Sequence, residues 1–179
     1  MAAAGVRWIQ VRAKAASGAE LHRELQACQR AIAGSPVVLW VDDRADLAAL
    51  LELSGLHLGQ GDLPPGAARL AVGPELWIGV STHNEEQVRR AEADPDVDLV
   101  AVGPVFPTTG KSRADPVVGV EFVRRARQLS GKPLVAIGGI DPGNLSQVLA
   151  AGADAAAVLG AVCRGDVAAN CGRLLAALP

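Results

Sequence analysis

Short apolar runs alternate along this chain with longer amphipathic or alanine-rich segments. The runs are apolar almost without interruption, which is typical of strands that are covered on both faces. They predict strands at 8–12, 37–43, 55–59, 76–81, 99–106, 133–139 and 155–160. The segments between them space their apolar residues as helices do and predict helices at 18–34, 44–55, 64–73, 83–93, 119–129, 143–152 and 166–178. Gly34, Gly55 and Gly152 stand where helices are expected to stop.

Repeated strand–helix units predict a parallel sheet with right-handed crossovers, within one α/β domain over residues 1–179. A doubly wound sheet would show a switch point and often a glycine-rich turn after the first strand, and neither is visible. Polar residues at the ends of nearly every strand favour a (β/α)8 barrel instead. Seven strands are one short, and residues 1–7 resemble the tail of a helix. We therefore expect the first strand and most of the first helix to be absent, and a homo-oligomer, strand exchange or a mis-set start to account for the gap.

The amino-acid composition indicates which binding partners and which cellular compartment to expect for this protein. The formal net charge of -2 gives no sign of a nucleic-acid-binding surface. Cys28, Cys163 and Cys171 are odd in number and form no CxxC pair, which favours a reducing cytoplasm over a disulfide scaffold or a zinc site. The first residues do not predict a signal peptide, and no run of about 18 uncharged apolar residues predicts a membrane span.

Chemistry-bearing residues gather where the predicted strands end, which is where barrels build their active sites. Gln10, Arg12 and Lys14 alternate, so they point the same way from an extended chain, and such cations bind phosphate oxygens. Asp43 and Asp62 suit Mg²⁺, which often bridges protein carboxylates to substrate phosphates. The other residues at these ends are Asp42 and Arg44, Gln60, Ser81 and His83, Thr108, Thr109 and Lys111, Gly138 and Gly139, and Gly160. The pattern predicts small phosphorylated substrates.

Each feature also has a simpler interpretation. The basic residues 10–14 could be a solvated strand end, and Asp42 or Asp43 could cap a helix. The glycine pair at 138–139 could be only a tight turn. His57 lies in an apolar strand, where a packed core histidine is expected more often than a ligand. The functional interpretation is favoured because all these features fall at the same end of successive strands.

Seven stretches together resemble the thiamine phosphate synthase family, which also includes the thiazole tautomerases. They are IQVRAK, WVDDRADLA, GLHLGQGDLP, IGVSTHN, VGPVFPTTGK, PLVAIGGI and AGADAAAVLGAV, in family order over nearly the whole chain. The resemblance implies an Mg²⁺-dependent transferase that joins a hydroxymethylpyrimidine diphosphate to a thiazole phosphate and releases pyrophosphate, in thiamine biosynthesis. It places Arg12, Lys14, Ser81 and Lys111 on the pyrophosphate and Asp43 and Asp62 on the metal. The substrate-binding residues that it implies are Gln10, Arg12, Lys14, Asp42, Ser81, Thr108, Thr109, Lys111, Gly139, Leu159 and Gly160.

The chain departs from the family pattern at the proposed site. Asp42 replaces the usual Asn before the first metal aspartate, Gly110 interrupts the usual T-x-T-K, and Gly160 replaces a serine of the last phosphate loop. Pro104 stands where the tautomerase branch often has a histidine, which favours the synthase branch. A tautomerase-like isomerase and a non-catalytic phosphate-binding remnant remain as alternatives.

Overall fold

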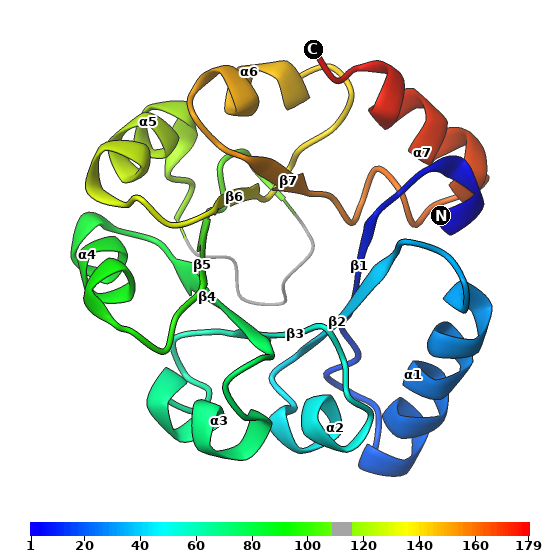
Figure 1. Cartoon of the computed structure of the whole chain (residues 1–179). Helices are drawn as coiled ribbons and strands as arrows, with labels where there is room; N and C mark the ends of the chain where they lie inside the picture. Colours follow the sequence, from blue (N-terminus) through cyan, green and yellow to red (C-terminus); the bar gives the residue numbers. More distant parts are fainter. Residues whose placement is uncertain (109–115) are drawn as a thin grey trace.

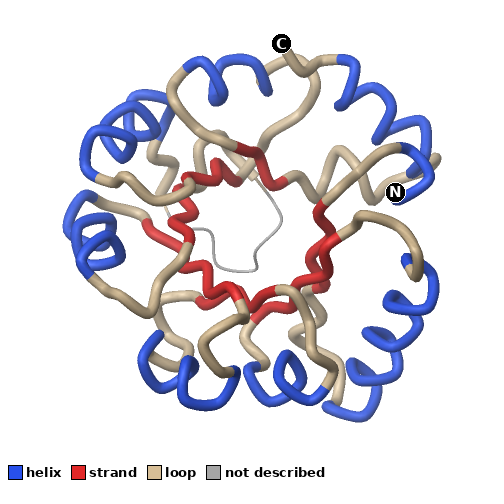
Figure 2. Tube along the Cα trace, viewed as in Figure 1, coloured by secondary structure: helices blue, strands red, loops and turns tan. Residues whose placement is uncertain are grey.

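The chain forms a ring of parallel strands surrounded by helices. The computed structural model describes residues 1–108 and 116–179. Seven strands lie in one parallel sheet, in the order of the sequence from β1 to β7. They are β1 (Trp8–Val11), β2 (Val38–Asp42), β3 (Gly55–Leu58), β4 (Trp77–Thr82), β5 (Leu99–Val102), β6 (Leu134–Ile137) and β7 (Ala155–Ala157). Figures 1 and 2 show the strands curling into an inner ring, with the helices outside it.

Each strand is followed by a helix that returns the chain to the start of the next strand. The helices are α1 (Gly18–Ile32), α2 (Ala45–Leu50), α3 (Pro65–Val72), α4 (Glu85–Ala93), α5 (Gly119–Leu129), α6 (Leu145–Ala150) and α7 (Val167–Ala176). A short 3-10 helix, η1 (Ala2–Ala4), precedes β1 and packs beside α7. All seven predicted strands and all seven predicted helices are confirmed, most of them with shorter ends.

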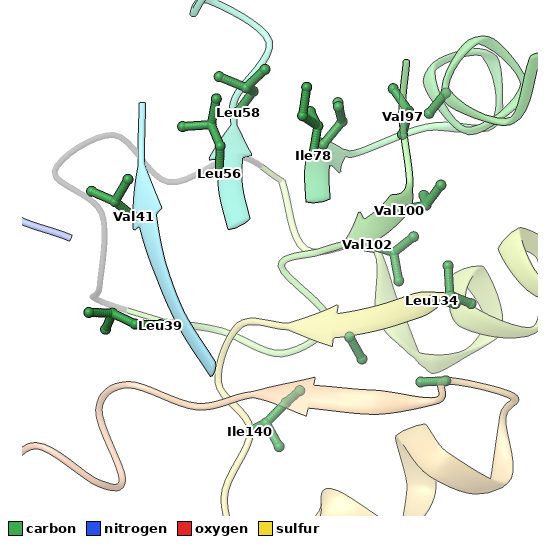
Figure 3. Close-up of a cluster of buried hydrophobic side chains, with 14 of the residues drawn as sticks. Leu39, Val41, Leu56, Leu58, Ile78, Val97, Val100, Val102, Leu134 and Ile140 are labelled. Carbon is green, nitrogen blue, oxygen red and sulfur yellow. The ribbon is translucent and has the colours of Figure 1, made fainter. Parts of the chain in front are cut away.

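The outward-facing side chains of the strands form the main core against the helices. Leu39 and Val41 of β2, Leu56 of β3 and Val100 of β5 are all nearly or fully buried there, and Figure 3 shows this cluster. These residues alternate with inward-facing ones, as a pleated strand requires. The near-continuous apolar character of the strands is thus explained by burial on both faces.

A second apolar cluster fills the inside of the ring. Trp8 and Trp40 lie with ring centroids 4.6 Å apart, and Leu99 and Val135 pack in the same cluster. The sequence predicted that a helix stops at Gly55, but this glycine begins β3, beneath the Trp40 indole. A Cβ on Gly55 would lie 2.1 Å from Trp40 Cε2, so the glycine makes room for the ring. The two indoles therefore form the floor below the mouth of the ring.

The opposite end of the ring, where the strands begin, is held by polar side chains that bind loop backbone. Arg69 donates to Asp98 Oδ2 at 2.6 Å, and this carboxylate also accepts the N–H of Ile78 at 2.7 Å. Glu92 of α4 accepts from the Ser130 hydroxyl at 2.6 Å and from the Gly131 N–H at 3.1 Å. These contacts tie neighbouring units together away from the predicted site, where barrels place their stabilising residues.

The strands β1 and β7 are the two ends of the sheet, since the described residues give each of them only one neighbour. In Figure 1 they lie next to one another, on the two sides of the opening in the ring. In the described part of the chain, no helix is long and apolar enough to cross a membrane.

Candidate active site

The mouth of the ring has a polar half and an apolar half. Inward positions near the carboxyl ends of the first four strands are polar, whereas those of the last three are apolar. The polar residues are Gln10, Asp42, His57 and Ser81, and the apolar ones are Ala101, Ile137 and Ala157. This division brings charged groups to one side of the mouth and leaves the other side suited to the flat face of a heterocycle.

Asp42, the last residue of β2, joins two of the predicted site residues. Its carboxylate is only 5% exposed and accepts hydrogen bonds from Gln10 Nε2 and from Arg12 Nη1, the latter at 2.6 Å. Arg12 is 33% exposed, so its remaining donors are open to solvent. A guanidinium has five N–H donors, and it can hold Asp42 with one edge and an anion with another. The buried carboxylate therefore fixes the direction of Arg12.

A second ion pair lies at the neighbouring strand ends. Lys14 Nζ is 2.8 Å from Asp43 Oδ2, and a side-chain hydrogen bond joins Asp43 to Asp62. Asp62 also accepts the N–H of Gly59 at 2.8 Å. Burial, followed by the hydrogen bond and the negative charge of Asp43, raises the pKa of the Asp62 carboxyl above its usual value. Asp43 adopts a φ of 64°, a left-handed conformation that a non-glycine residue adopts uncommonly and that turns its side chain at the strand end.

These two carboxylates fit the requirements of Mg²⁺. Two adjacent carboxylates repel each other, and a divalent cation between them would offset that repulsion. Mg²⁺ commonly takes one or two protein carboxylates and completes its shell with water and phosphate oxygens. Among residues 1–108 and 116–179, no group of three or more His, Cys, Asp or Glu side chains could hold a metal. Asp43 and Asp62 could supply two oxygen ligands to such an ion, with water and phosphate oxygens as the others.

Ser81 lies inside the mouth, held by two residues of the preceding unit. His57 Nε2 is 2.8 Å from Ser81 Oγ, and Gln60 Nε2 donates to the Ser81 carbonyl at 2.7 Å. His57 is therefore part of the site wall, whereas the sequence favoured a packed core histidine. Alternation along the predicted strand 55–59 could have indicated this, because Gly55 and His57 lie on the same face of that strand.

The apolar half ends in a pocket of about 360 Å³ lined by Pro107, Thr108, Gly160 and Arg164. The segment before Thr108 is held against the turn after β6, where Phe106 donates its N–H to the Gly138 carbonyl at 3.0 Å. Gly139, with φ 64°, packs so closely that a Cβ would lie 2.5 Å from the Pro107 oxygen. Arg164 was not predicted, because it follows the last of the seven matching stretches, which ends at Val162.

Every predicted site residue in the described part of the chain lies at the mouth end of its strand. Gln10, Arg12, Asp42 and the Lys14–Asp43–Asp62 group are brought together by direct contacts. Thr108 and Gly160 share the second pocket, and the exposed Leu159 precedes it. Thr109 and Lys111 lie outside the described residues, so their predicted roles stay predictions.

Comparisons with known proteins agree on one family. The family model described as thiamine monophosphate synthase matches residues 1–162. A thiamine-phosphate synthase of Koribacter versatilis is 46% identical over 159 residues, covering 89% of this chain and 74% of the relative. One from Acidothermus cellulolyticus is 44% identical over 160 residues, covering 89% and 75%.

Solved structures give the same result. Thiamine phosphate pyrophosphorylase from Pyrococcus furiosus superposes with a TM-score of 0.88 at 32% identity, covering 97% of this chain and 83% of that one. A 3-hexulose-6-phosphate synthase, at 18% identity and a TM-score of 0.73, shares the fold alone. The sequence stretches, the strand-end residues and these matches lead to the same assignment, and the chain belongs to the thiamine monophosphate synthase family.

Proposed function

We propose that this protein is a thiamine-phosphate synthase, a transferase that joins hydroxymethylpyrimidine diphosphate to thiazole phosphate. The observation that carries this proposal is the placement of Arg12 and Lys14 at the polar half of the mouth, in a chain 46% identical to a thiamine-phosphate synthase. In the reaction, the bond between the pyrimidine methylene carbon and the diphosphate oxygen breaks, and its electron pair leaves with pyrophosphate. The thiazole nitrogen then donates its electron pair to form the new carbon–nitrogen bond.

The described residues suit a reaction of this kind. A departing pyrophosphate needs positive charge and hydrogen-bond donors at the leaving oxygens. Arg12 and Lys14 supply the charge, and the Ser81 hydroxyl is a neutral hydrogen-bonding group at the same mouth. The apolar half, with Ile137 38% exposed, offers a surface for the rings. Lys111 stays a predicted contact to the leaving group, and the substrate-binding roles stay part of this proposal.

We also propose that Asp43 and Asp62 hold Mg²⁺ together with the diphosphate. The bound ion would neutralise charge on the leaving group and release Lys14 from its pairing with Asp43. Calorimetry with inorganic pyrophosphate should show tighter binding when Mg²⁺ is present. Asp43→Asn and Asp62→Asn should each abolish that gain, and a gain unchanged in both variants would place the metal elsewhere.

The activity is tested by pyrophosphate release from the two substrates, with and without Mg²⁺. Arg12→Ala and Lys14→Ala should each weaken binding of the pyrimidine diphosphate about tenfold or more, the usual effect of losing a charge-assisted contact, and leave thiazole phosphate binding nearly unchanged. Arg89→Ala is the matched control, since this exposed α4 arginine pairs only with Glu85. Equal losses for both ligands would contradict the assignment, and absence of pyrophosphate release would refute the function.

We further propose that the seven-stranded sheet is a (β/α)8 barrel without its first strand and most of its first helix. The support is the pair of sheet ends, β1 and β7, whose unpaired backbone groups suit another strand. An upstream segment or a second copy of the chain would supply it. Adding an upstream strand and helix should raise the melting temperature by several degrees, with light scattering reporting the oligomeric state. A monomer equally stable without them would contradict this proposal. A single domain and a cytoplasmic location stay predictions.

A further inference from the structure

The loop between β7 and α7 carries an arginine at a fixed position. Asn170, in the first turns of α7 and only 8% exposed, donates through Nδ2 to the Arg164 carbonyl at 2.6 Å and to the Val162 carbonyl at 3.0 Å. Arg173 in turn donates to the Asn170 side-chain oxygen. The backbone at residue 164 is therefore anchored to the buried side of α7, although the arginine itself is exposed.

The Arg164 guanidinium has no hydrogen bond or ion pair with any residue in 1–108 or 116–179. This contrasts with Arg173 of the neighbouring helix α7, whose guanidinium donates to the Asn170 side chain. Arg164 instead lines the pocket of about 360 Å³ together with Pro107, Thr108 and Gly160. A cation at the wall of a pocket that makes no ion pair with a described carboxylate attracts an anion.

Among the described residues that line the pocket, Arg164 carries the charge, and the others are Pro107, Thr108 and Gly160. Gly160 opens onto free space, because a Cβ built there would meet nothing within 4 Å. Pro107 contributes no backbone N–H. Thr108 contributes a hydroxyl group. Arg164 is thus the lining residue that can supply a full positive charge to an occupant of this pocket.

We infer that Arg164 is a substrate-binding residue for the phosphate group of the thiazole phosphate, an inference that rests on the proposed function. A phosphate monoester is close to a dianion at neutral pH, and an arginine can hold two of its oxygens at once. At this position the arginine supplies the charge that Gly160 cannot. It also makes the site selective for the phosphorylated thiazole over the corresponding alcohol, since the alcohol offers the guanidinium no anionic oxygen.

The test compares binding of thiazole phosphate with binding of the thiazole alcohol by calorimetry. Arg164→Ala should weaken thiazole phosphate binding about tenfold or more and leave alcohol binding unchanged, and Arg164→Lys should recover part of the loss. Arg124→Ala is the matched control, because this exposed arginine of α5 pairs with Glu121. Thermal melts confirm that each variant is folded. Phosphate binding equal to that of Arg124→Ala, or an equal loss of alcohol binding, would overturn the inference.

Steady-state kinetics separate this inference from the proposed function. The KM for thiazole phosphate should rise in Arg164→Ala, while the KM for the pyrimidine diphosphate stays within about twofold of its original value. If Arg164→Ala releases pyrophosphate normally and its KM for thiazole phosphate is unchanged, the role of Arg164 is refuted and the proposed function still stands. No pyrophosphate release by the unaltered enzyme would refute the proposed function, and the calorimetric comparison would still decide whether Arg164 binds the phosphate group.

Discussion

The contact between Arg12 and Asp42 predicts a non-additive pair of substitutions. Arg12→Ala leaves the Asp42 carboxylate, 5% exposed, with Gln10 as its remaining side-chain donor. Asp42→Asn removes the charge and keeps an oxygen that accepts from one of the two donors. The combined variant contains neither charge. We expect Arg12→Ala to lower the free energy of unfolding more than Asp42→Asn does, and the combined variant to be more stable than the sum of the two losses indicates.

The expected loss of unfolding free energy follows from how deeply each side chain of the Arg12–Asp42 pair is buried. Removing one partner of a fully buried ion pair costs about 3 to 5 kcal/mol, because an uncompensated charge remains. Arg12 is 33% exposed, so water reaches the space it would leave, and about 2 kcal/mol is the expected cost of Arg12→Ala. Asp42→Asn leaves a solvent-accessible guanidinium and should cost about 1 kcal/mol. Neutralising the carboxylate in the combined variant should recover about 1 kcal/mol as a coupling energy.

The assay is urea unfolding of the four proteins at neutral pH, with the coupling energy taken from the complete cycle. A chain of this length shifts its melting temperature by roughly 2 to 4 °C per kcal/mol, so thermal melts give an independent measurement. Independent sites add within about 0.3 to 0.5 kcal/mol. Losses that add within that limit, or Asp42→Asn costing more than Arg12→Ala, would refute the argument that Asp42 is a buried charge held by Arg12.

Three further predictions concern stability. Gly55→Ala should lower the free energy of unfolding by about 1 to 3 kcal/mol in a urea titration, because the added Cβ would overlap the Trp40 indole. Combining Gly55→Ala with Trp40→Leu should recover much of this loss, and the absence of any recovery would contradict the steric cause. Asp62→Asn should raise the melting temperature at pH 7 without divalent metal, because the raised pKa of Asp62 means that its ionised carboxyl destabilises the fold. The gain in melting temperature should shrink at lower pH, and a variant that melts at a lower temperature than the original protein at pH 7 would contradict this prediction. The hydrogen bond from Ser130 lowers the pKa of Glu92, so the stability that Glu92 contributes is present above its unfolded pKa and is lost as the pH falls through its pKa in the folded state. Glu92→Gln should therefore lower the free energy of unfolding by up to about 1 kcal/mol at pH 7 and leave it unchanged in strong acid. A loss of stability that persists in acid would contradict this pH dependence.

The sequence predicted the parts of this fold that depend on burial along one segment. Apolar runs and helical spacing located each strand and helix, and the strand ends located Arg12, Asp43 and Ser81 at one mouth. Gly55 was predicted both to stop a helix and to begin a strand, and only the strand is confirmed, because α2 already ends at Leu50.

Contacts between distant segments could not be predicted. The capture of Arg12 by Asp42 depends on the shape of the barrel mouth, which neither segment encodes alone. The same holds for Arg164, whose approach to Thr108 requires the last loop to return to the fifth strand. The strand-end residues themselves were found, whereas the contact between Arg12 and Asp42 and the place of Arg164 were not.

The paired indoles of Trp8 and Trp40 give this protein an internal optical reporter. They lie one layer below the ligand-facing residues, with ring centroids 4.6 Å apart, and Trp8 Nε1 is buried without a hydrogen-bond partner in the described part of the chain. Their emission should be blue-shifted by the apolar surroundings, whereas Trp77, 48% exposed, should emit as a solvated indole. A ligand that fills the mouth changes the polarity directly above the pair, so selective excitation of tryptophan should follow occupancy in real time without an attached dye.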